Sequence, residues 1–534
     1  MTEKQPIYIL PENASRVLGR DAQRNNIMAA RIIADTVKTT LGPKGMDKML
    51  VDSLGDITVT NDGVTILKEM EVEHPAAKMI VEIAKTQEDE VGDGTTTAVM
   101  IAGKLLENAE TLLDKKIHPT TIIKGYRIAA EKAKKILESQ AIDVKPEDID
   151  LLKKIAETAI TGKGASVVKD KFAKIIVDAI KQIEENGKID LSAIKLEKSK
   201  GEGIEDTELI KGIVLDKERV SIDMPSKVKN AKIALIDCAL EIKSPETETK
   251  ISISTPEQLQ NFIDQEESIL RRMVEKIKDT KANVVFCQKG IDDIAQYYLA
   301  KYGIYACRRV AKSDMEKLAK ATGGKIVSNL NELTPDQLGE AEIVEEVKHK
   351  EEAMTYVRGC KNPKSLTILL KGGTEHVLDE MERSITDGLG DVAAALKDGK
   401  IVAGGGAIEI EVAKELRKFS QSLSGREQLA VEQFASALEF IPTTLAENAG
   451  LDPIEIITEL KARHEKGEKY TGLNLITGKI EDNFKAGVVE PLRIKTQALA
   501  SATEVSMMIL RIDDVIAATS KSSSKSSPMP EMVD

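Results

Sequence analysis

Apolar residues recur with helical spacing along much of the chain, and two such segments flank a glycine-rich turn. The first segment begins at Pro75, a favoured first helical residue, and ends near Val91. The second begins after Gly94 and continues to the stop signals at residues 115–119. The pattern therefore predicts two amphipathic helices joined by VGDGTTT, residues 91–97, with both glycines just before the second helix.

This turn has the properties of an anion-binding site. The first N–H groups of a helix are free and carry the positive end of its dipole, and glycine lets a phosphate approach the backbone. The hydroxyl groups of Thr95, Thr96 and Thr97 add donors. Asp93 is a further anion here, so a bound phosphate would need a cation between the two, and Mg²⁺ takes carboxylates together with phosphate oxygens. A simpler interpretation stays open, in which Asp93 only caps the second helix of a tight turn.

The N-terminal region before these helices shows three patterns. Residues 1 to about 16 resemble a loose arm, and a helix is predicted from Arg20 to about Thr40, where LGPKG ends it. Residues 49–52 and 57–60 predict a hairpin that runs into Asn61-Asp62-Gly63. Asp62, an acid beside a glycine at a strand end, is by itself typical of a turn.

From about residue 145 the pattern changes to short helices and polar links. The segment TAITGKG, residues 158–164, is predicted to be a flexible polar loop. It carries Lys163, which on its own is expected to be solvated because a lone surface charge usually is.

Strands alternate with helices between about residues 218 and 370. Apolar runs of strand length lie at 233–238, 284–287 and 304–307, a βαβ pattern that predicts an α/β domain. A long helix starting at Thr255-Pro256 carries an apolar stripe as far as Ile277. Such a stripe fits a core helix or an arm that covers its apolar residues against a neighbour.

Helical spacing returns after residue 370. Asp387 falls within a predicted helix, and Gly404-Gly405-Gly406 precede another, which offers a second close approach of backbone to a ligand. The last residues, 519–534, are Ser- and Lys-rich and are predicted to be disordered.

Composition excludes several classes of function. A length of 534 residues suggests about three or four domains, and a net charge of −12 disfavours nucleic acid or an anionic membrane as partner. No apolar run spans a bilayer and no signal peptide is recognisable, so the cytoplasm is expected. The four cysteines lack C-x-x-C spacing and are expected to be reduced core residues rather than zinc ligands. Aromatic residues make up only 3%, so the cores must be aliphatic.

Seven segments, spread over nearly the whole chain, together resemble a group II chaperonin, the family of the archaeal thermosome and its relative in the eukaryotic cytosol. They are LGPKGMDKMLVDSLGDITVTNDGVTIL, EHPAAKMIVEIAKTQEDEVGDGTTTAV, ELIKGIVLDKERV, FCQKGIDDIAQYYLAK, AGGGAIE, SGREQLAVEQFASALEFIPTTLAENAGLD and VVEPLRIKTQALASATE.

The resemblance implies a multidomain subunit: a mostly α-helical equatorial domain, a small α/β intermediate domain and an α/β apical domain with a helical protrusion as a built-in lid. The implied limits are 1–145 and 407–518 for the equatorial domain, 146–217 and 370–406 for the intermediate domain, 218–369 for the apical domain, 243–277 for the lid, and 519–534 for the tail.

The resemblance also implies ATP and ADP, Mg²⁺ and, as an optional addition, a monovalent cation such as K⁺. Asp387, with Asp62 beside it, is the implied catalytic residue that orients or deprotonates the attacking water. Asp93 is the implied metal ligand, and Lys163 matches a lysine that senses the γ-phosphate. The implied nucleotide-binding residues are Leu41, Gly42, Pro43, Asp93, Gly94, Thr95, Thr96, Thr97, Lys163, Gly405, Gly406, Asn474 and Glu490.

The function implied is an ATP-dependent chaperone that encloses non-native proteins. It would form two stacked eight-membered rings of one or several subunit types, with no nucleic-acid or membrane partner. Ile251, Ile253, Leu259 and Phe262 of the lid are expected to offer apolar contacts. Two alternatives stay open: a magnesium-dependent small-molecule kinase or ligase, and a noncatalytic ring scaffold. Three acids, Asp62, Asp93 and Asp387, argue against the scaffold, and residues 218–369 show no acid/base pair that would serve the enzyme.

Overall fold

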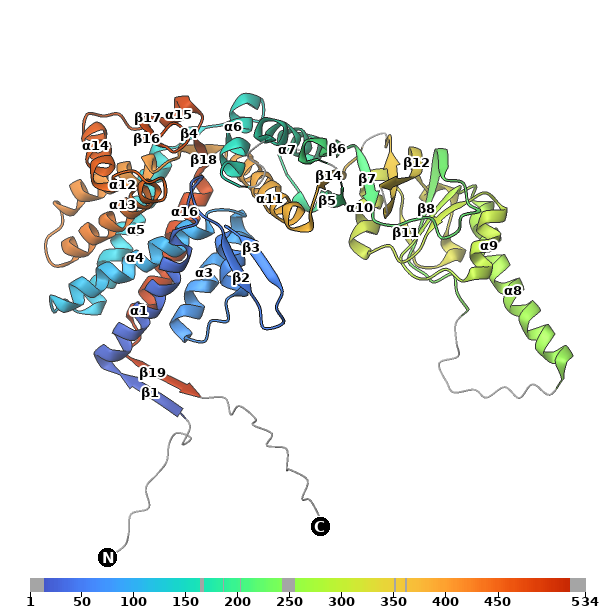
Figure 1. The fold of residues 1–534 in the computed structure, drawn as a ribbon, viewed down its shortest axis with the longest axis horizontal. Coiled ribbons are helices and arrows are strands. Elements are labelled where there is room, and N and C mark those ends of the chain that lie inside the picture. Colours follow the sequence, from blue (N-terminus) through green and yellow to red (C-terminus); the bar gives the residue numbers. More distant parts are fainter. Residues whose placement is uncertain are drawn as a thin grey trace, which may run out of the picture.

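In the computed structural model the chain forms an elongated molecule of three successive parts, each with its own hydrophobic core (Figure 1). The structure describes residues 14–163, 168–185, 187–201, 203–242, 255–349, 352–360 and 363–518. The helical part has core residues from Ile27 to Leu137 and from Val402 to Leu510. The central part has its core between Val144 and Ile194 and between Leu366 and Ile401, together with Val489. The distal part has its core between Ile213 and Cys360. Both ends of the chain thus build the helical part.

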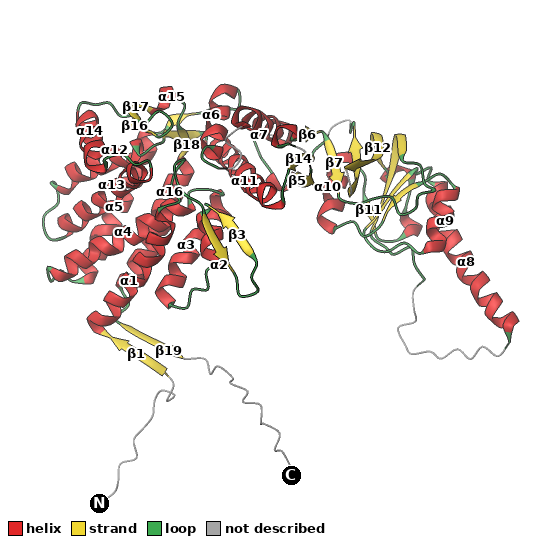
Figure 2. Cartoon of the chain, in the orientation of Figure 1, coloured by secondary structure: helices red, strands yellow, loops and turns green. Residues whose placement is uncertain are grey.

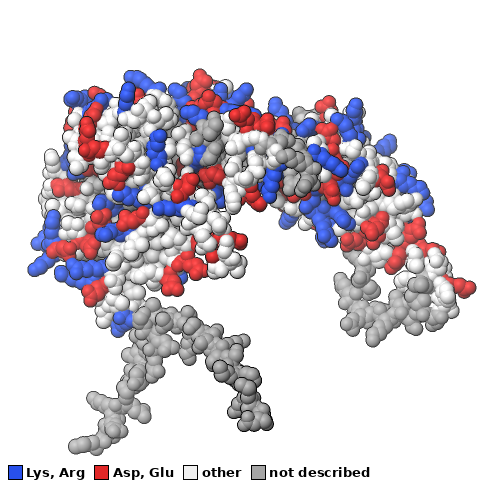
Figure 3. All heavy atoms as spheres, viewed as in Figure 1, with Lys and Arg blue, Asp and Glu red and all other residues white. Residues whose placement is uncertain are grey.

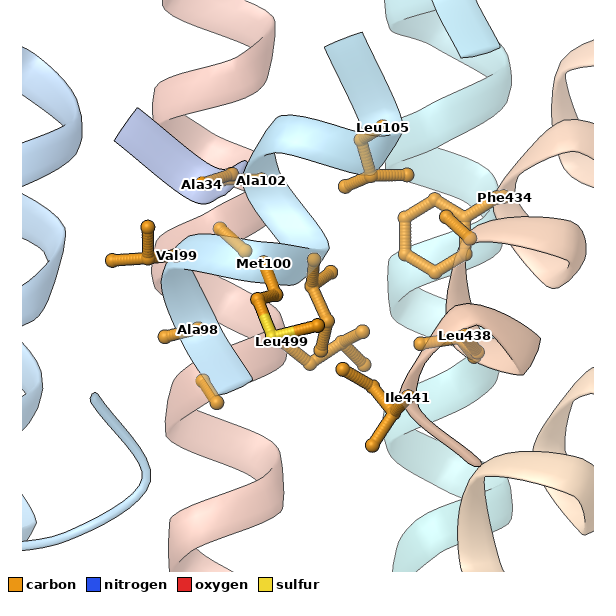
Figure 4. Close-up of a cluster of buried hydrophobic side chains, with 14 of the residues drawn as sticks. Ala34, Ala98, Val99, Met100, Ala102, Leu105, Phe434, Leu438, Ile441 and Leu499 are labelled. Atoms are coloured by element: carbon orange, nitrogen blue, oxygen red, sulfur yellow. The ribbon is translucent and has the colours of Figure 1, made fainter. Parts of the chain in front are cut away.

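The helical part is a bundle in which α4 lies at the centre, against α1, α13 and α16. Its helices are α1 (Gly19–Lys38), α2 (Gly63–Glu69), α3 (Pro75–Val91), α4 (Thr95–Asp114), α5 (Pro119–Gln140), α12 (Ala407–Ser420), α13 (Glu427–Asn448), α14 (Pro453–Glu465), α15 (Asn483–Ala486) and α16 (Leu492–Leu510). Figure 4 shows Met100 and Leu105 of α4 facing Phe434 and Ile441 of α13. These four side chains are buried, and the core is mostly aliphatic as predicted.

Two small antiparallel ribbons flank this bundle. The predicted hairpin is confirmed as β2 (Lys48–Val51) paired with β3 (Ile57–Thr60). The prediction of a loose arm is wrong for residues 14–16, because β1 (Ala14–Leu18) pairs with β19 (Asp514–Ala518). Its partner strand lies at the far end of the sequence, where local patterns cannot reveal it. Residues 1–13 and the predicted tail, 519–534, lie outside the described residues.

The central part is a small α/β layer (Figure 2). Strand β14 lies parallel to β5 and antiparallel to β6, and every residue of β14 is buried. Its elements are α6 (Ile149–Ile160), α7 (Lys169–Ile183), β5 (Ile194–Lys200), β6 (Glu208–Ile210), β14 (Leu366–Gly372) and α11 (Glu375–Asp398). The loop predicted at 158–164 is wrong at its start, because α6 continues to Ile160. Residues 164–167 lie outside the described residues.

A second sheet links the central and helical parts. It has the order β18-β15-β4, from β4 (Ile142–Asp143), β15 (Lys400–Ala403) and β18 (Val489–Pro491). The hairpin of β16 (Thr471–Asn474) and β17 (Lys479–Asp482) lies nearby in the helical part. Val91, Ala394 and Ile494 form a small apolar cluster between α3, α11 and α16. The end of α3 and the start of α16 are therefore held against α11.

The distal part holds the predicted βαβ pattern and more. Strands β8, β9 and β10 are parallel, as expected, and β12, β13 and β7 extend the sheet in antiparallel pairs. The elements are β7 (Gly212–Leu215), β8 (Lys227–Ile236), α8 (Pro256–Asp279), β9 (Val284–Cys287), α9 (Asp293–Lys301), β10 (Tyr305–Cys307), α10 (Lys312–Thr322), β11 (Ile326–Val327), β12 (Gly339–His349) and β13 (Glu352–Arg358). Short 3₁₀ turns lie at Leu191–Ala193, Ile204–Asp206, Leu330–Glu332 and Pro335–Gln337. All four cysteines are free, as expected, and Cys238 is only half-buried.

Helix α8 extends beyond the distal part at one end (Figure 1). Thr255 caps it as predicted, since its hydroxyl accepts a hydrogen bond from the Gln258 N–H at 3.4 Å. The last turns are anchored because Leu270, Val274 and Ile277 are buried, whereas Phe262 and Ile263 are exposed. The stripe is therefore core at one end and open at the other. Residues 243–254, with Ile251 and Ile253, lie outside the described residues, and the Leu259 side chain is not described.

Candidate nucleotide site

A pocket lies where the helical and central parts meet, and every predicted nucleotide-binding residue lines it. These residues are Leu41, Gly42, Pro43, Asp93, Gly94, Thr95, Thr96, Thr97, Lys163, Gly405, Gly406, Asn474 and Glu490. Asp62 also lines the pocket, and Asp387 adjoins it through an ion pair with Lys163. The family resemblance therefore selected residues that the fold brings together from eight separate stretches of sequence.

The glycine-rich turn leaves the N-terminus of α4 open to the pocket. Gly94 is the N-cap residue in a left-handed conformation (φ +80°), and no side chain caps the helix. The interpretation of Asp93 as a simple cap is therefore wrong. Gln87 fixes the turn by donating from Nε2 to the carbonyl oxygen of Asp93 at 2.8 Å. A Cβ at Gly94 would lie 2.5 Å from Ile494 Cγ2, so only glycine fits.

Asp62 serves both as a turn residue and as part of the pocket wall. It caps α2, because its Oδ2 accepts hydrogen bonds from the Thr65 N–H at 2.9 Å and the Thr65 hydroxyl at 2.6 Å. The next residue, Gly63, packs so closely on α4 that a Cβ there would lie 2.5 Å from Thr96 Oγ1. This contact brings the Asp62 carboxylate beside the N-terminal turn of α4.

The loop at residues 41–43 is fixed from two sides. Asn448 donates from Nδ2 to the carbonyl oxygen of Leu41 at 2.9 Å. Gly42 has φ +79°, and a Cβ there would lie 2.5 Å from Leu445 Cδ2. On the other side, Gly162 contacts Pro43 so closely that a Cβ at Gly162 would overlap with the proline Cα. The loop of Lys163 is thereby seated against the pocket.

The pocket is also lined by two residues of the glycine triplet and by residues of β16 and β18. Gly405 and Gly406 both have positive φ, and the Leu473 N–H donates to the carbonyl oxygen of Gly405 at 2.9 Å. Asn474 donates from Nδ2 to Glu481 at 2.7 Å. Glu490 forms an ion pair with Lys495 at 2.5 Å. These polar groups line the same pocket as Lys163.

Lys163 and Asp387 form a buried ion pair. Their side chains are only 19% and 16% exposed, so the expectation of a solvated lysine is wrong. Burial raises the pKa of Asp387 to about 7, against the opposing effect of Lys163 and with a smaller contribution from Asp93. A carboxylate with this pKa can accept a proton at neutral pH more readily than an ordinary aspartate.

The sequence reasoning missed several residues of the pocket, above all Asp391. It lies one helical turn after Asp387 on α11, lines the pocket and is 2% exposed. Burial and then Asp93 raise the pKa of Asp391 well above its ordinary value. The (i, i+4) spacing from Asp387 is the signal that could have found it. Asn61, Glu157, Thr158, Gly162 and Lys495 also line the pocket and were not predicted.

The residues present fit a nucleotide phosphate with a divalent cation. The N-terminus of α4 is uncapped, as an anion site requires, and Asp93 stands beside it. Among the described residues, no group of three or more His, Cys, Asp or Glu side chains is placed to hold a metal by itself. A cation here therefore needs phosphate oxygens as well, which is the usual environment of Mg²⁺.

Comparison with known proteins identifies the class. The model of the TCP-1/cpn60 chaperonin family matches residues 33–520, so the chain belongs to that family. A thermosome subunit of Methanopyrus kandleri is 62% identical over 516 residues, covering 96% of this chain and 95% of the relative. Thermosome subunit beta of Archaeoglobus fulgidus is 61% identical over 536 residues, covering 99% and 98%.

A solved structure gives the subdivision within the family. The open-state monomer of a group II chaperonin from Methanococcoides burtonii has a TM-score of 0.59 and 49% identity, covering 79% of this chain and 100% of that chain. Taken with the thermosome matches, this makes the protein a group II chaperonin. The alternative of a small-molecule kinase or ligase finds no support in these matches. No helix among the described residues is both long and apolar enough to cross a membrane.

Proposed function

We propose that the protein is an ATP-dependent chaperonin that hydrolyses ATP with Mg²⁺ in this pocket and encloses non-native proteins in a double-ring chamber. One observation carries the proposal: the pocket combines the N-terminus of α4 in the helical part with Lys163 and Asp387 of the central part. A site shared between two parts of a chain is completed only when they approach, so hydrolysis and shape become coupled.

The three parts, each with its own hydrophobic core, support the proposed division into domains. The helical part corresponds to an equatorial domain (1–145 and 407–518), the central part to an intermediate domain (146–217 and 370–406), and the distal part to an apical domain (218–369). The lid would be residues 243–277, of which α8 supplies the described portion from Pro256. The exposed Phe262 and Ile263 suit contact with a client or a neighbouring lid.

Each of the predicted site residues then has a chemical role. The N–H groups at the start of α4 and the hydroxyls of Thr95–Thr97 bind phosphate oxygens, and Asp93 holds Mg²⁺, which when bound neutralises phosphate charge. Asp387 accepts the proton of the attacking water, with Asp62 helping to orient that water. Leu41–Pro43, Gly405, Gly406, Asn474 and Glu490 hold the base and ribose.

Lys163 would report the presence of the γ-phosphate. In the described structure its ammonium group is paired with Asp387. A γ-phosphate carries more negative charge than one carboxylate and competes for the lysine. Movement of Lys163 toward the phosphate would free Asp387 for proton transfer, so the same event that fills the site activates its base.

The proposed partners follow from the relatives. Archaeoglobus fulgidus has both alpha and beta thermosome subunits among the similar proteins, which supports a ring built from one or several subunit types. The arrangement of two stacked eight-membered rings stays a prediction from the family resemblance. Acidic and basic side chains are interspersed on the face drawn in Figure 3, a surface that does not favour nucleic acid. A cytoplasmic location and a K⁺ requirement stay predictions.

Client protection tests this function. An aggregation-prone protein is captured by the purified oligomer, ATP and Mg²⁺ are added, and protease is applied. The proposal expects the client to survive with ATP and to be digested without it. Asp387→Ala should capture the client and fail to protect it during cycling. Digestion of the client at equal rates with and without ATP would contradict an enclosing chamber.

A further inference from the structure

Asp391 is a buried carboxylate that the mechanism above does not use. Its side chain is 2% exposed and lines the nucleotide pocket. Its Oδ1 is buried without a hydrogen-bond partner among the described residues. A buried, unpaired carboxylate is costly to the folded protein, and groups of this kind are normally satisfied by a partner or a cation. Such a group in a ligand pocket therefore points to a role in binding a ligand.

Close helix packing explains why Asp391 faces this site. Its neighbour Gly390 lies against the glycine-rich turn, where a Cβ at Gly390 would be 3.1 Å from the carbonyl oxygen of Val91 and 3.6 Å from Gly92 Cα. Asp391 follows Gly390 on α11, and Asp93 follows Gly92 on the turn. Both aspartates line the pocket. Two carboxylates from different parts of the molecule thus flank one contact.

The charged groups around Asp391 carry an excess of negative charge, which favours binding of a cation. The groups whose charges act on it are Asp93, Lys163, Asp387 and Glu490, three acids and one base. The base is already paired with Asp387, and Glu490 is paired with Lys495. Asp93 and Asp391 are the two acids of this group without an ion pair among the described residues.

We propose that Asp391 supplies a second carboxylate, beside Asp93, to the divalent cation that accompanies the nucleotide phosphates. Mg²⁺ is bound in proteins by one or two carboxylates together with phosphate oxygens, and a carboxylate from α11 would be the second. Because α11 belongs to the central part, the cation would join the central part to the phosphates. The inference rests on the proposed function, since the cation site exists only with a bound nucleotide.

The magnesium dependence of ADP affinity separates this role from a structural one. Asp391→Asn keeps the size of the side chain and removes its charge. With Mg²⁺ the variant should bind ADP at least about tenfold more weakly than the wild type, as expected for loss of a group that supports a metal. With EDTA it should bind ADP as well as or better than the wild type, because one anion near the phosphates is gone. Its nucleotide-free melting temperature should be equal or higher, because the neutral amide avoids the cost of ionising a buried carboxyl group.

The controls make the result decisive. Asp379→Asn removes another aspartate of α11, which is partly exposed and paired with Lys198 at 2.6 Å, and should leave the magnesium effect unchanged. Equal weakening of ADP binding with and without Mg²⁺ in Asp391→Asn would overturn the inference, as would an unchanged magnesium effect. Failure of the wild type to bind ADP in either condition would instead overturn the proposed function, and this inference with it.

A second variant covers the case in which Asp391→Asn does not fold. Asp93→Asn leaves Asp391 as the remaining carboxylate ligand, so the affinity gain that Mg²⁺ gives to ADP should be reduced and still measurable. Complete loss of that gain in Asp93→Asn would show that Asp391 provides no ligand.

Discussion

Lys163 of the pocket is paired with Asp387, which adjoins the pocket, although 224 residues separate them in the sequence. Both come from the central part, one from the turn after α6 and the other from α11. Each also lies in the field of Asp93 on the glycine-rich turn. The pair is therefore the link between the central part and the phosphate-binding end of α4, and the predictions below begin from it.

Removal of the Asp387 carboxylate should separate binding from hydrolysis. Asp387→Ala leaves the N-terminus of α4, Asp93 and the threonine hydroxyls in place, so ATP should still bind. Hydrolysis should fall by about 10²–10⁴-fold, the usual contribution of a general base. The measurement is phosphate release beside ATP binding. Asp398→Asn, on the same helix and paired with Arg493 at 3.4 Å, is the control. Turnover at the wild-type rate in Asp387→Ala would remove Asp387 from the mechanism.

Hydrolysis should fall as the pH drops through neutrality. Burial raises the pKa of Asp387 to about 7, so the proton-accepting form is present above this pH and is lost below it. Lys163 opposes the rise, so Lys163→Met should move the midpoint of the pH profile upward. Single-turnover rates between about pH 6 and 9 would check both statements. A flat profile, or a midpoint that moves downward in Lys163→Met, would exclude Asp387 as the base.

Glycine at position 162 should be needed for nucleotide binding, and not only because the backbone there is left-handed. Gly162 (φ +87°) and Gly467 (φ +91°) both have left-handed backbones, but only Gly162 contacts Pro43, and nothing lies within 4 Å of a Cβ at Gly467. Backbone strain should cost either alanine variant about 1–2 kcal/mol of stability, and the overlap with Pro43 adds to this cost in Gly162→Ala. Only Gly162→Ala should also weaken ADP binding, measured by calorimetry. Equal ADP affinity in the two variants would contradict the seating of this loop on the pocket.

Substitution of Lys495 should destabilise the protein more than substitution of any other lysine that lines the pocket. It is 9% exposed and pairs with Glu409 at 2.9 Å and Glu490 at 2.5 Å. Lys495→Met leaves the buried carboxylate of Glu409 and the partly buried carboxylate of Glu490 without their cation. Loss of one partner of a buried ion pair costs about 3–5 kcal/mol. Lys485→Met is the matched control, because Lys485 is 83% exposed in its pair with Asp482. Thermal unfolding compares them, and similar melting temperatures would show that the Lys495 cluster is not stabilising.

Much of the site could be predicted because its signals are local. A helix N-terminus after two glycines is visible in consecutive residues, and the structure places Gly94 and Thr95 there. Residues far apart in sequence, such as Asn474 and Glu490, were assigned only through the family resemblance, and they line the same pocket. Their roles toward a nucleotide are part of the proposal.

The rest depends on packing between distant segments. Lys163 looks solvated in sequence because its partner lies on α11. Asp391 gains its environment only when Gly390 lies against Gly92, a contact that no local pattern encodes. The pairing of β1 with β19 joins opposite ends of the chain, so the arm could not be recognised as a strand. The antiparallel strand β12 was missed because it has no continuous apolar run of strand length, the signal that identified β8, β9 and β10, although its residues alternate in part as in a half-buried strand.

The most direct test of the central claim measures hydrolysis and closure on the same sample. Purified protein of known mass is given ATP with and without Mg²⁺, and both phosphate release and protease cleavage within residues 243–277 are followed. The account predicts a ring-sized particle, turnover that requires Mg²⁺, and protection of this segment by nucleotide in step with turnover. A small particle, or turnover at full rate with no protection of the segment, would contradict a chamber that closes on ATP hydrolysis.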